Sequence, residues 1–298
     1  LQNSLFIFNF NITVMKKFIN QIIILATILT IVVVSLTGGV YFIQSQASFE
    51  LPPDRHILIL GDSHTECAIN DDIYNRAANV AQGAAMHLYS YCKLKKFLNE
   101  NRHIDTVLLS FHYITLRSDI ENRWEKFTFQ KVPFYLTLFS WEDIDVFSSK
   151  KKNLLKSVFH PPYMLVLKFV IKGGRISYKD LNIGGYNWSN RNRLQEDIAI
   201  KQEKQTEEEG IWFYQKEYLL KIVDLCKSRN VELILINTPT YKPEIYGDLD
   251  KLNDFYNAYL SEIKYWDYSA FPLPDDCYGD IGHLNYKGAE IFSKYLQK

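Results

Sequence analysis

The sequence predicts an α/β protein, a three-layer α/β/α sandwich around a central parallel sheet, preceded by one N-terminal transmembrane helix. Short apolar runs at residues 57–60, 104–111 and 231–237 are typical of buried strands. Between them lie segments with apolar residues at helical spacing, such as the segment that ends at Leu98 and residues 211–228. Strands that alternate with helices imply a parallel sheet that is covered on both faces.

The N-terminal region carries an uncharged apolar run at residues 22–43. A helix needs about 20 apolar residues to cross a bilayer, so this run is long enough. Lys16 and Lys17 favour the cytoplasmic side, which places residues 1–21 in the cytoplasm and the chain after Gln44 outside it. A cleaved signal peptide is the rival, but its apolar core usually spans only about 7 to 15 residues. We therefore expect a single-pass protein of the inner or plasma membrane with an extracytoplasmic domain.

Two further segments flank this predicted anchor. Residues 1–14 precede Met15, which together with the two lysines that follow is typical of a start, and we expect residues 1–14 not to be translated. Residues 44–54 form a short linker with two prolines, which would space the domain from the membrane. The remaining residues, 55–298, are predicted to form the α/β domain.

The first predicted strand of that domain ends in a turn. Residues 57–60 run into Gly61, so the Ser63 hydroxyl is expected at the carboxyl end of the sheet, where open α/β folds bind their ligands. A helix is predicted to follow Ser63. Residues 79–83 then read as a short strand that ends in a glycine turn at Gly83, and the chain closes with a helical segment at 280–296.

Between about residues 114 and 210 the strand and helix pattern degrades. This insertion is rich in aromatic residues, among them Tyr135, Trp141 and Trp188. Long insertions in compact α/β folds are often lids or binding loops. Two compatible interpretations remain open: a substrate-binding cap whose aromatic rings stack on sugars or cover an acyl chain, and a small helical subdomain whose aromatic rings form its own core.

Composition narrows the class of protein. The chain has 298 residues, of which 47% are hydrophobic, enough for a packed core. Lys plus Arg equals Asp plus Glu, at 34 each, so no global positive field attracts nucleic acid, and no nucleic-acid partner is expected.

The four cysteines are Cys67, Cys92, Cys226 and Cys277. Their number allows disulfides in an oxidising compartment, but four cysteines permit three pairings and the spacing selects none. No Cys-x-x-Cys is present, so the sequence gives no sign of structural zinc, and buried free thiols are the favoured interpretation.

Two short segments about two hundred residues apart together supply a serine, a histidine and a carboxylate: Ser63 near the front, and Asp280 and His283 near the end. A serine is a poor nucleophile at neutral pH unless a base takes its proton, and the base works best when a third group holds its tautomer. Ser63 as nucleophile, His283 as base and Asp280 as orienting carboxylate would fill these roles.

Gly61-Asp62-Ser63 after an apolar strand, combined with Asp280-x-x-His283 near the end, resembles the SGNH (GDSL-type) hydrolase family. The sequence that follows, Leu284-Asn285-x-x-Gly288-Ala289, resembles the membrane-anchored, envelope-facing branch that is similar to DltD and AlgJ/AlgX-type proteins. The resemblance implies a flavodoxin-like sandwich and an esterase or O-acyltransferase that acts through an acyl-enzyme on acyl esters of an envelope or secreted glycan. It also implies that no cofactor is needed, and that a membrane acyltransferase is a potential partner.

In the resembled family, the oxyanion is held by the nucleophile's N–H, a glycine N–H and an asparagine side chain. Ser63 and Gly83 match the first two positions, whereas Ser110-Phe111-His112 aligns with the third, so that His112 stands where asparagine is expected. A neutral imidazole can donate one N–H, so His112 could serve as the donor. It could equally be a satisfied histidine at a strand end.

Three neighbours of these residues are candidates for lining the pocket. Asp62 is expected to fix the turn by accepting backbone hydrogen bonds. His64 follows the nucleophile and is expected to face solvent or substrate, and Gln82 lies beside Gly83. None of the other histidines shows metal-ligand spacing with acidic residues, so no metal is predicted.

His112 in place of asparagine also motivates a second hypothesis. On this view the domain is a catalytically weak relative that binds polymer or scaffolds a membrane acyltransferase complex. Both hypotheses place Ser63 and His283 at the same sheet edge, but only the enzyme requires a usable oxyanion site.

Overall fold

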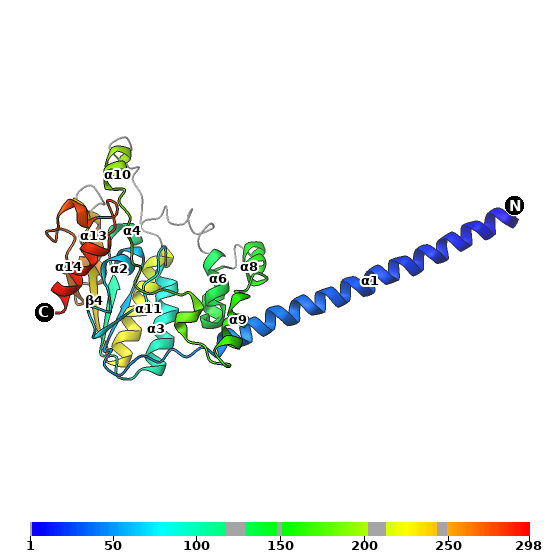
Figure 1. The fold of residues 1–298 in the computed structure, drawn as a ribbon, viewed down its shortest axis with the longest axis horizontal. Coiled ribbons are helices and arrows are strands. Elements are labelled where there is room, and N and C mark those ends of the chain that lie inside the picture. Colours follow the sequence, from blue (N-terminus) through cyan, green and yellow to red (C-terminus); the bar gives the residue numbers. More distant parts are fainter. Residues whose placement is uncertain (1, 117–128, 148–150, 202–212, 243–248) are drawn as a thin grey trace.

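The sheet edge predicted to carry the site belongs to a five-stranded parallel sheet with strand order β2-β1-β3-β4-β5 (Figure 1). A computed structural model describes residues 2–116, 129–147, 151–201, 213–242 and 249–298 of the chain. In chain order, the strands are β1 Ile57–Leu60, β2 Ala77–Asn79, β3 Thr106–Ser110, β4 Glu232–Asn237 and β5 Lys264–Asp267. All neighbouring pairs are parallel, which confirms the predicted α/β class.

Helices cover both faces of the sheet because alternate strand residues are apolar on both sides. Leu58, Val107 and Leu235 pack in the core cluster of one face. The helices of that face are α3 His87–Glu100, α11 Phe213–Arg229 and α13 Leu249–Tyr259. Ile59 and Ile234 point to the other face. That face carries α2 Ser63–Ala68 and α14 Tyr286–Leu296. Continuous apolar runs are what a strand buried on both faces requires.

One predicted strand lies elsewhere in the structure, and one strand was not predicted. The strand predicted at 79–83 is β2, which lies earlier, at Ala77–Asn79. The chain beyond it still follows β1, because Val80 donates its N–H to Ile59 and Gln82 donates to Gly61 (2.9 and 3.0 Å). Strand β5 could not be predicted from the sequence, because this edge strand is only partly buried and lacks an apolar run.

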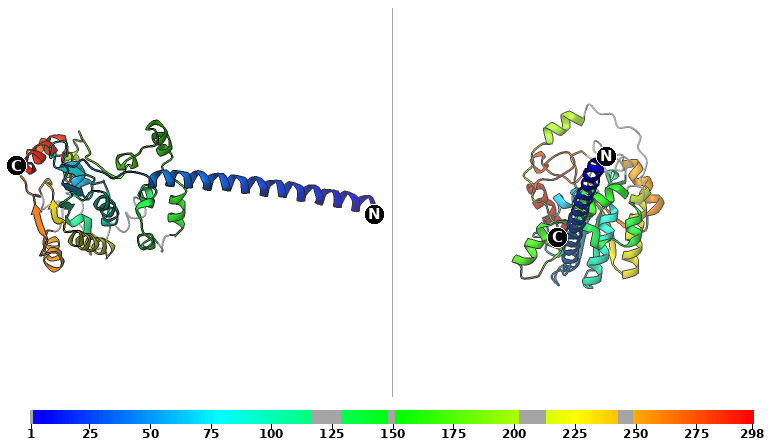
Figure 2. Two further views of the ribbon diagram at one scale, coloured as in Figure 1. Left: turned by 90° about the horizontal axis from the view of Figure 1, so that it is seen from below. Right: turned by 90° about the vertical axis from the view of Figure 1, so that its right-hand side faces the viewer.

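The N-terminal helix α1 spans Gln2–Ser45 and extends away from the α/β domain (Figures 1 and 2). Its segment Val14–Ser45 contains an 18-residue window with a mean hydropathy of 2.5 and is long and apolar enough to cross a membrane. Its end is packed against the domain. Gln44 Nε2 donates to the carbonyl of Phe134 (2.5 Å), and Tyr41 Oη donates to the carbonyl of Val158 (2.7 Å).

The predicted linker at 44–54 does not act as a free spacer. Phe49 and Leu51 are buried in the core cluster of the α3 face. The backbone N–H of Leu51 donates to Asn101 Oδ1 (2.7 Å), and Asn101 Nδ2 donates back to the carbonyl of Phe49 (2.8 Å). The chain that follows α1 is therefore fixed to the domain.

The described part of the insertion contains several short helices. Its elements are α4 Tyr113–Leu116, α6 Phe129–Tyr135, η2 Leu136–Leu138, α7 Trp141–Asp145, α8 Lys151–Val158, α9 Met164–Ile171, η4 Tyr178–Leu181 and α10 Leu194–Lys201. Tyr135 is buried and packs against Tyr89 of α3, as the subdomain-core interpretation expects, whereas Trp141 and Trp188 are exposed. Residues 117–128, 148–150 and 202–210 of the insertion lie outside the described part.

All four cysteines are free and buried, as the favoured interpretation expected. Burial raises the pKa of the Cys67 and Cys226 thiols to about 12, so both remain protonated and unreactive at neutral pH.

Lys93 is fully buried in α3, where its Nζ donates to the carbonyls of Val80 and Ile183. It thereby joins the chain after β2 to the insertion. Burial lowers the pKa of Lys93 to about 7, because desolvation disfavours the charged ammonium.

The buried Lys93 predicts a specific pH dependence of stability. The unfolded chain holds this proton up to about pH 10. Between about pH 7 and 10 the unfolded state therefore binds more protons than the native state, so stability rises with pH by up to about 1.4 kcal/mol per pH unit. Urea unfolding at several pH values should show this slope in the native protein and lose it in Lys93→Met. Lys96→Met, at a partly exposed ion pair on the same helix, should keep the slope. Equal slopes in all three proteins would contradict the assignment.

Candidate active site

The turn that presents Ser63 depends on Gly61. Gly61 has φ +134°, and a Cβ at this position would lie 2.2 Å from the Cβ of Ser110 on β3. Only glycine therefore allows the chain to turn this close to the neighbouring strand. Asp62 then caps α2, since its Oδ1 accepts the backbone N–H of His64 (3.1 Å), as predicted for this residue. Ser63 is the first residue of α2, at the carboxyl edge of the sheet.

Ser63, His283 and Asp280 form a hydrogen-bonded chain. Ser63 Oγ donates to His283 Nε2 (2.7 Å), and His283 Nδ1 donates to Asp280 Oδ1 (2.7 Å). We assign the proton to Nδ1 because an ionised carboxylate can only accept. That tautomer leaves Nε2 able to take the serine proton, and both distances are within the reach that proton transfer requires.

Asp280 is held ionised by its surroundings. Burial alone would raise the pKa of this carboxyl, but hydrogen bonds from His283, Arg191 and the backbone N–H of Gly282 hold it well below its usual range. The carboxylate therefore remains charged at neutral pH, where it can fix the imidazole tautomer and stabilise an imidazolium.

Arg191 is a site residue that sequence reasoning missed. Its Nη1 donates to Asp280 Oδ2 (2.5 Å). It lies in the insertion, 89 residues away in sequence, and belongs to no local motif. The segment around Arg191 runs beside the segment that carries Asp280 and His283. The N–H of Arg193 donates to the carbonyl of Gly279 (2.8 Å), and the N–H of Tyr286 donates to the carbonyl of Ser189 (2.8 Å). The insertion thus supplies a charged hydrogen bond to Oδ2 of the Asp280 carboxylate.

Arg191→Gln is expected to lower kcat/KM for an ester by about 3- to 10-fold, because one charged hydrogen bond to Asp280 is lost from a half-exposed position. Arg193→Gln is the matched control, since Arg193 lies two residues on and pairs with exposed Glu196. Equal kcat/KM values in the two variants would show that Arg191 does not position Asp280.

The predicted glycine donor lies beside the serine. A Cβ built on Gly83 would lie 3.7 Å from the Cβ of Ser63 and 2.9 Å from Oε2 of Glu66. The backbone N–H of Gly83 hydrogen bonds to the Glu66 carboxyl, and burial raises the pKa of that carboxyl. Glu66, in the first turn of α2, was not singled out from the sequence because nothing in its neighbourhood pairs it with the loop after β2.

His112 is buried and bonded to the turn. Its Nε2 donates to Asp62 Oδ2 (2.8 Å), and Ser110 Oγ donates to Asp62 Oδ1 (3.0 Å). The Nε2 proton is therefore committed to Asp62, as the satisfied-histidine interpretation expects, and a donor role for His112 would have to use Nδ1. Burial would raise the pKa of Asp62, but His112 and His64 hold it well below its usual range.

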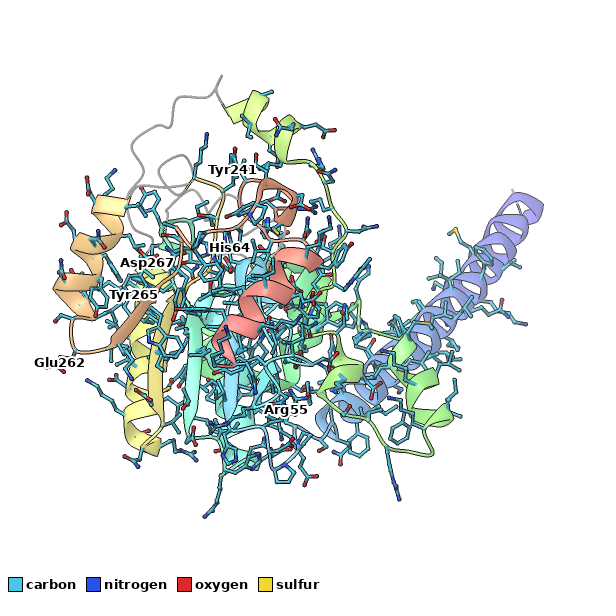
Figure 3. The ribbon with its side chains drawn as sticks, turned by 60° about the vertical axis from the view of Figure 1, so that its left-hand side comes forward. Arg55, His64, Tyr241, Glu262, Tyr265 and Asp267 are labelled. Atoms are coloured by element: carbon cyan, nitrogen blue, oxygen red, sulfur yellow. The ribbon has the colours of Figure 1, made fainter. Side chains whose placement is uncertain are left out.

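The expectation that His64 faces solvent is wrong. His64 is buried, with its ring centroid 4.0 Å from the ring of His112 and 4.9 Å from that of His283. It lies at the opposite end of the sheet from Arg55, which precedes β1 (Figure 3). Burial and the neighbouring His112 lower its pKa well below the usual range, so His64 is neutral and packs beside His283.

Asp62, His64 and His112 each offer an atom that could bind a metal ion, all within 4.8 Å of one another. Both Asp62 oxygens and Nε2 of His112 already take part in hydrogen bonds, however. A proton shared between Asp62 and His112 fits their 2.8 Å contact, so we assign no metal to this group.

Gln82 connects the site to the insertion. Its Nε2 donates to the carbonyl of Asn182 (2.9 Å), and its Oε1 accepts from Tyr135 Oη (2.7 Å). Both ends of the amide are therefore bonded to the insertion, which makes Gln82 a brace for the loop that carries Gly83.

Comparisons with known proteins add little at the level of sequence. No curated protein matches the chain. A family model without a functional description matches residues 186–298.

Some solved structures are weakly similar to this chain. One is a proposed acylhydrolase from Bacteroides fragilis (14% identity, 82% of this chain and 85% of that chain, TM-score 0.35). Another is a GDSL-like lipase from Bacteroides thetaiotaomicron (9% identity, 87% of this chain and 94% of that chain, TM-score 0.37). Both structures have a low sequence identity and a low TM-score to this chain.

Proposed function

We propose that the protein is a serine esterase or O-acyltransferase that works through an acyl-enzyme on Ser63. The observation that carries the proposal is the continuous chain from Ser63 Oγ through His283 to Asp280, with both contacts at 2.7 Å. Three residues in this order and geometry are what activates a serine at neutral pH.

The reaction follows from the proton positions. His283 Nε2 takes the Ser63 proton as Oγ attacks the acyl carbonyl, and the resulting imidazolium faces ionised Asp280. His283 then gives the proton to the leaving alkoxide, which leaves the acyl group as an ester on Ser63. In the second half-reaction, His283 deprotonates water or a sugar hydroxyl, which attacks that ester and regenerates the serine.

We propose an acyl ester of an envelope or secreted glycan as substrate. Exposed Trp188 stacks on Tyr286 with ring centroids 5.2 Å apart. Tyr286 lies three residues after His283 in the sequence. Exposed aromatic rings suit the apolar faces of sugars. Helix α1, anchored in the inner or plasma membrane with the domain on the extracytoplasmic side, would hold the enzyme close to such a polymer.

The experiment measures p-nitrophenol release from p-nitrophenyl acetate by the full chain in detergent, with and without an oligosaccharide acceptor. The proposal expects release well above the buffer rate, with the acetyl group recovered as acetate by a hydrolase or on the sugar by a transferase. Release no faster than in buffer under both conditions would contradict the proposal.

A second candidate function is favoured by one observation. The N–H of Gly83 is engaged by the Glu66 carboxyl and Nε2 of His112 by Asp62, so two of the three predicted oxyanion donors have protein partners. A domain with a formed triad and an occupied oxyanion site would suit binding a polymer or scaffolding a membrane acyltransferase.

Glu66→Ala separates the two candidates. If the protein is an enzyme, Glu66 must give up the Gly83 N–H during turnover, so its removal should raise kcat/KM for p-nitrophenyl acetate. One oxyanion donor contributes about 100-fold or more to the rate of such a reaction. We expect Glu66→Ala to raise kcat/KM by about 3- to 10-fold. Glu290→Ala on α14, at an exposed ion pair, is the control and should change nothing. No gain in Glu66→Ala would favour the scaffold.

A further inference from the structure

The insertion packs on α1 where a membrane-spanning segment would end. Counting about 20 residues from Lys17, at 1.5 Å each, brings α1 across the roughly 30 Å hydrocarbon layer near Thr37. From that residue on, one side of α1 is buried: Thr37, Val40 and Gln44 are all covered. The part of α1 that the insertion covers therefore begins where the hydrocarbon layer is expected to end.

Helix α9 lies beside this end of α1 (Figures 1 and 2). One side of α9 packs inward through buried Leu165. The opposite side is bare: Met164, Leu167, Val170 and Ile171 are 67%, 51%, 69% and 74% exposed. These positions recur at helical spacing, so they form one apolar stripe.

Two exposed aromatic residues just before α9 extend this stripe towards α1. Phe159 and Tyr163 are 40% and 51% exposed, and the carbonyl of neighbouring Val158 accepts the Tyr41 hydroxyl of α1. We call the six side chains the membrane face: Phe159, Tyr163, Met164, Leu167, Val170 and Ile171. An exposed group of large apolar side chains of this kind marks an interaction surface.

Exposed basic residues flank the membrane face along the chain. Lys156, Arg175 and Lys179 are exposed, and Lys172 is half-exposed beside Asp180. A short helix with a bare apolar stripe and flanking basic residues is the pattern of a segment that lies in a membrane interface, with apolar side chains in the acyl region and cations at lipid phosphates.

We infer that the membrane face is immersed in the surface of the same bilayer that α1 crosses. The inference rests on the proposed anchor. Lipid is favoured over a protein partner because the stripe continues the exposed apolar surface of α1, and because the flanking basic residues match anionic headgroups. The domain is then held at two points, α1 and α9, at a fixed height and orientation on the membrane.

The experiment places one reporter at a time in the full chain. Cysteine substitutions at Val170, Leu29 and Ile291 each carry an environment-sensitive fluorophore, while the four native thiols are buried. Leu29 lies in the predicted span, and exposed Ile291 lies on α14, at the far end of the molecule from α1 (Figure 1). Each labelled protein is reconstituted in vesicles of phosphatidylcholine and phosphatidylglycerol that contain a nitroxide on the lipid acyl chain, at a low and a high protein-to-lipid ratio.

We expect quenching of the Leu29 and Val170 reporters to be at least about twofold stronger than quenching of the Ile291 reporter, at both protein-to-lipid ratios. If Leu29 is quenched and Val170 behaves like Ile291, the anchor stands and the membrane face is overturned. If Leu29 is not quenched, the anchor fails and the inference fails with it. Shielding of Val170 only at the high ratio would assign the face to a second copy of the chain and overturn the lipid assignment.

Discussion

Replacing Ser63 with alanine is expected to reduce kcat for p-nitrophenyl acetate by at least about 10⁴-fold, because no other described group stands at the position of the attacking atom. The alanine lacks only the hydroxyl that donates to His283 Nε2, so His283 and Asp280 should keep their contact. Initial rates of p-nitrophenol release measure the effect, and thermal unfolding verifies that the variant is folded.

The control for this variant is Ser228→Ala. Ser228 lies in α11, where its hydroxyl donates only to the carbonyl of Leu225 in the same helix, so its loss should leave the rate unchanged. A folded Ser63→Ala variant that retains more than about a tenth of the native rate would show that the acyl group does not pass through Ser63.

Asp280→Asn is expected to lower kcat by about 10³- to 10⁴-fold with little change in KM. An amide at this position can present its NH₂ group to His283 Nδ1, which would move the imidazole proton to Nε2 and leave no acceptor for the Ser63 hydroxyl. Steady-state kinetics of the full chain, together with the rate of acylation, should place the loss in the chemical step.

Asp276→Asn is the matched control for the carboxylate. Asp276 lies four residues before Asp280 and forms an exposed ion pair with Lys287. Its substitution should leave kcat unchanged, because exposed ion pairs contribute little. If Asp280→Asn loses less than about threefold, the carboxylate does not control the tautomer of His283.

The sequence predicted the fold where burial leaves a pattern that can be read along the chain. Residues 57–60, 106–110 and 232–237 carry apolar residues in succession because they are covered on both faces. The edge strand at 264–267 is half-exposed and lacks this pattern, so it could not be recognised. The linker at 44–54 reads as polar and proline-bearing, but its alternate residues Phe49 and Leu51 are buried by segments far away in sequence.

The triad residues could be proposed because each belongs to a local motif. Arg191 and Glu66 could not, because their importance comes from contacts with residues that are remote in the chain: Arg191 with Asp280, and Glu66 with Gly83. The burial of His64 was missed for the same reason, since it depends on His112 arriving from β3 and His283 from the chain's end.

A fluorophosphonate ester tests directly whether Ser63 is an activated serine, because such reagents phosphonylate an activated serine and do not turn over. The full chain is treated with the reagent, and its mass is measured before and after digestion. We expect one adduct, located on Ser63 and lost in both Ser63→Ala and His283→Ala. Absence of an adduct, or an adduct on another residue that survives in Ser63→Ala, would contradict it.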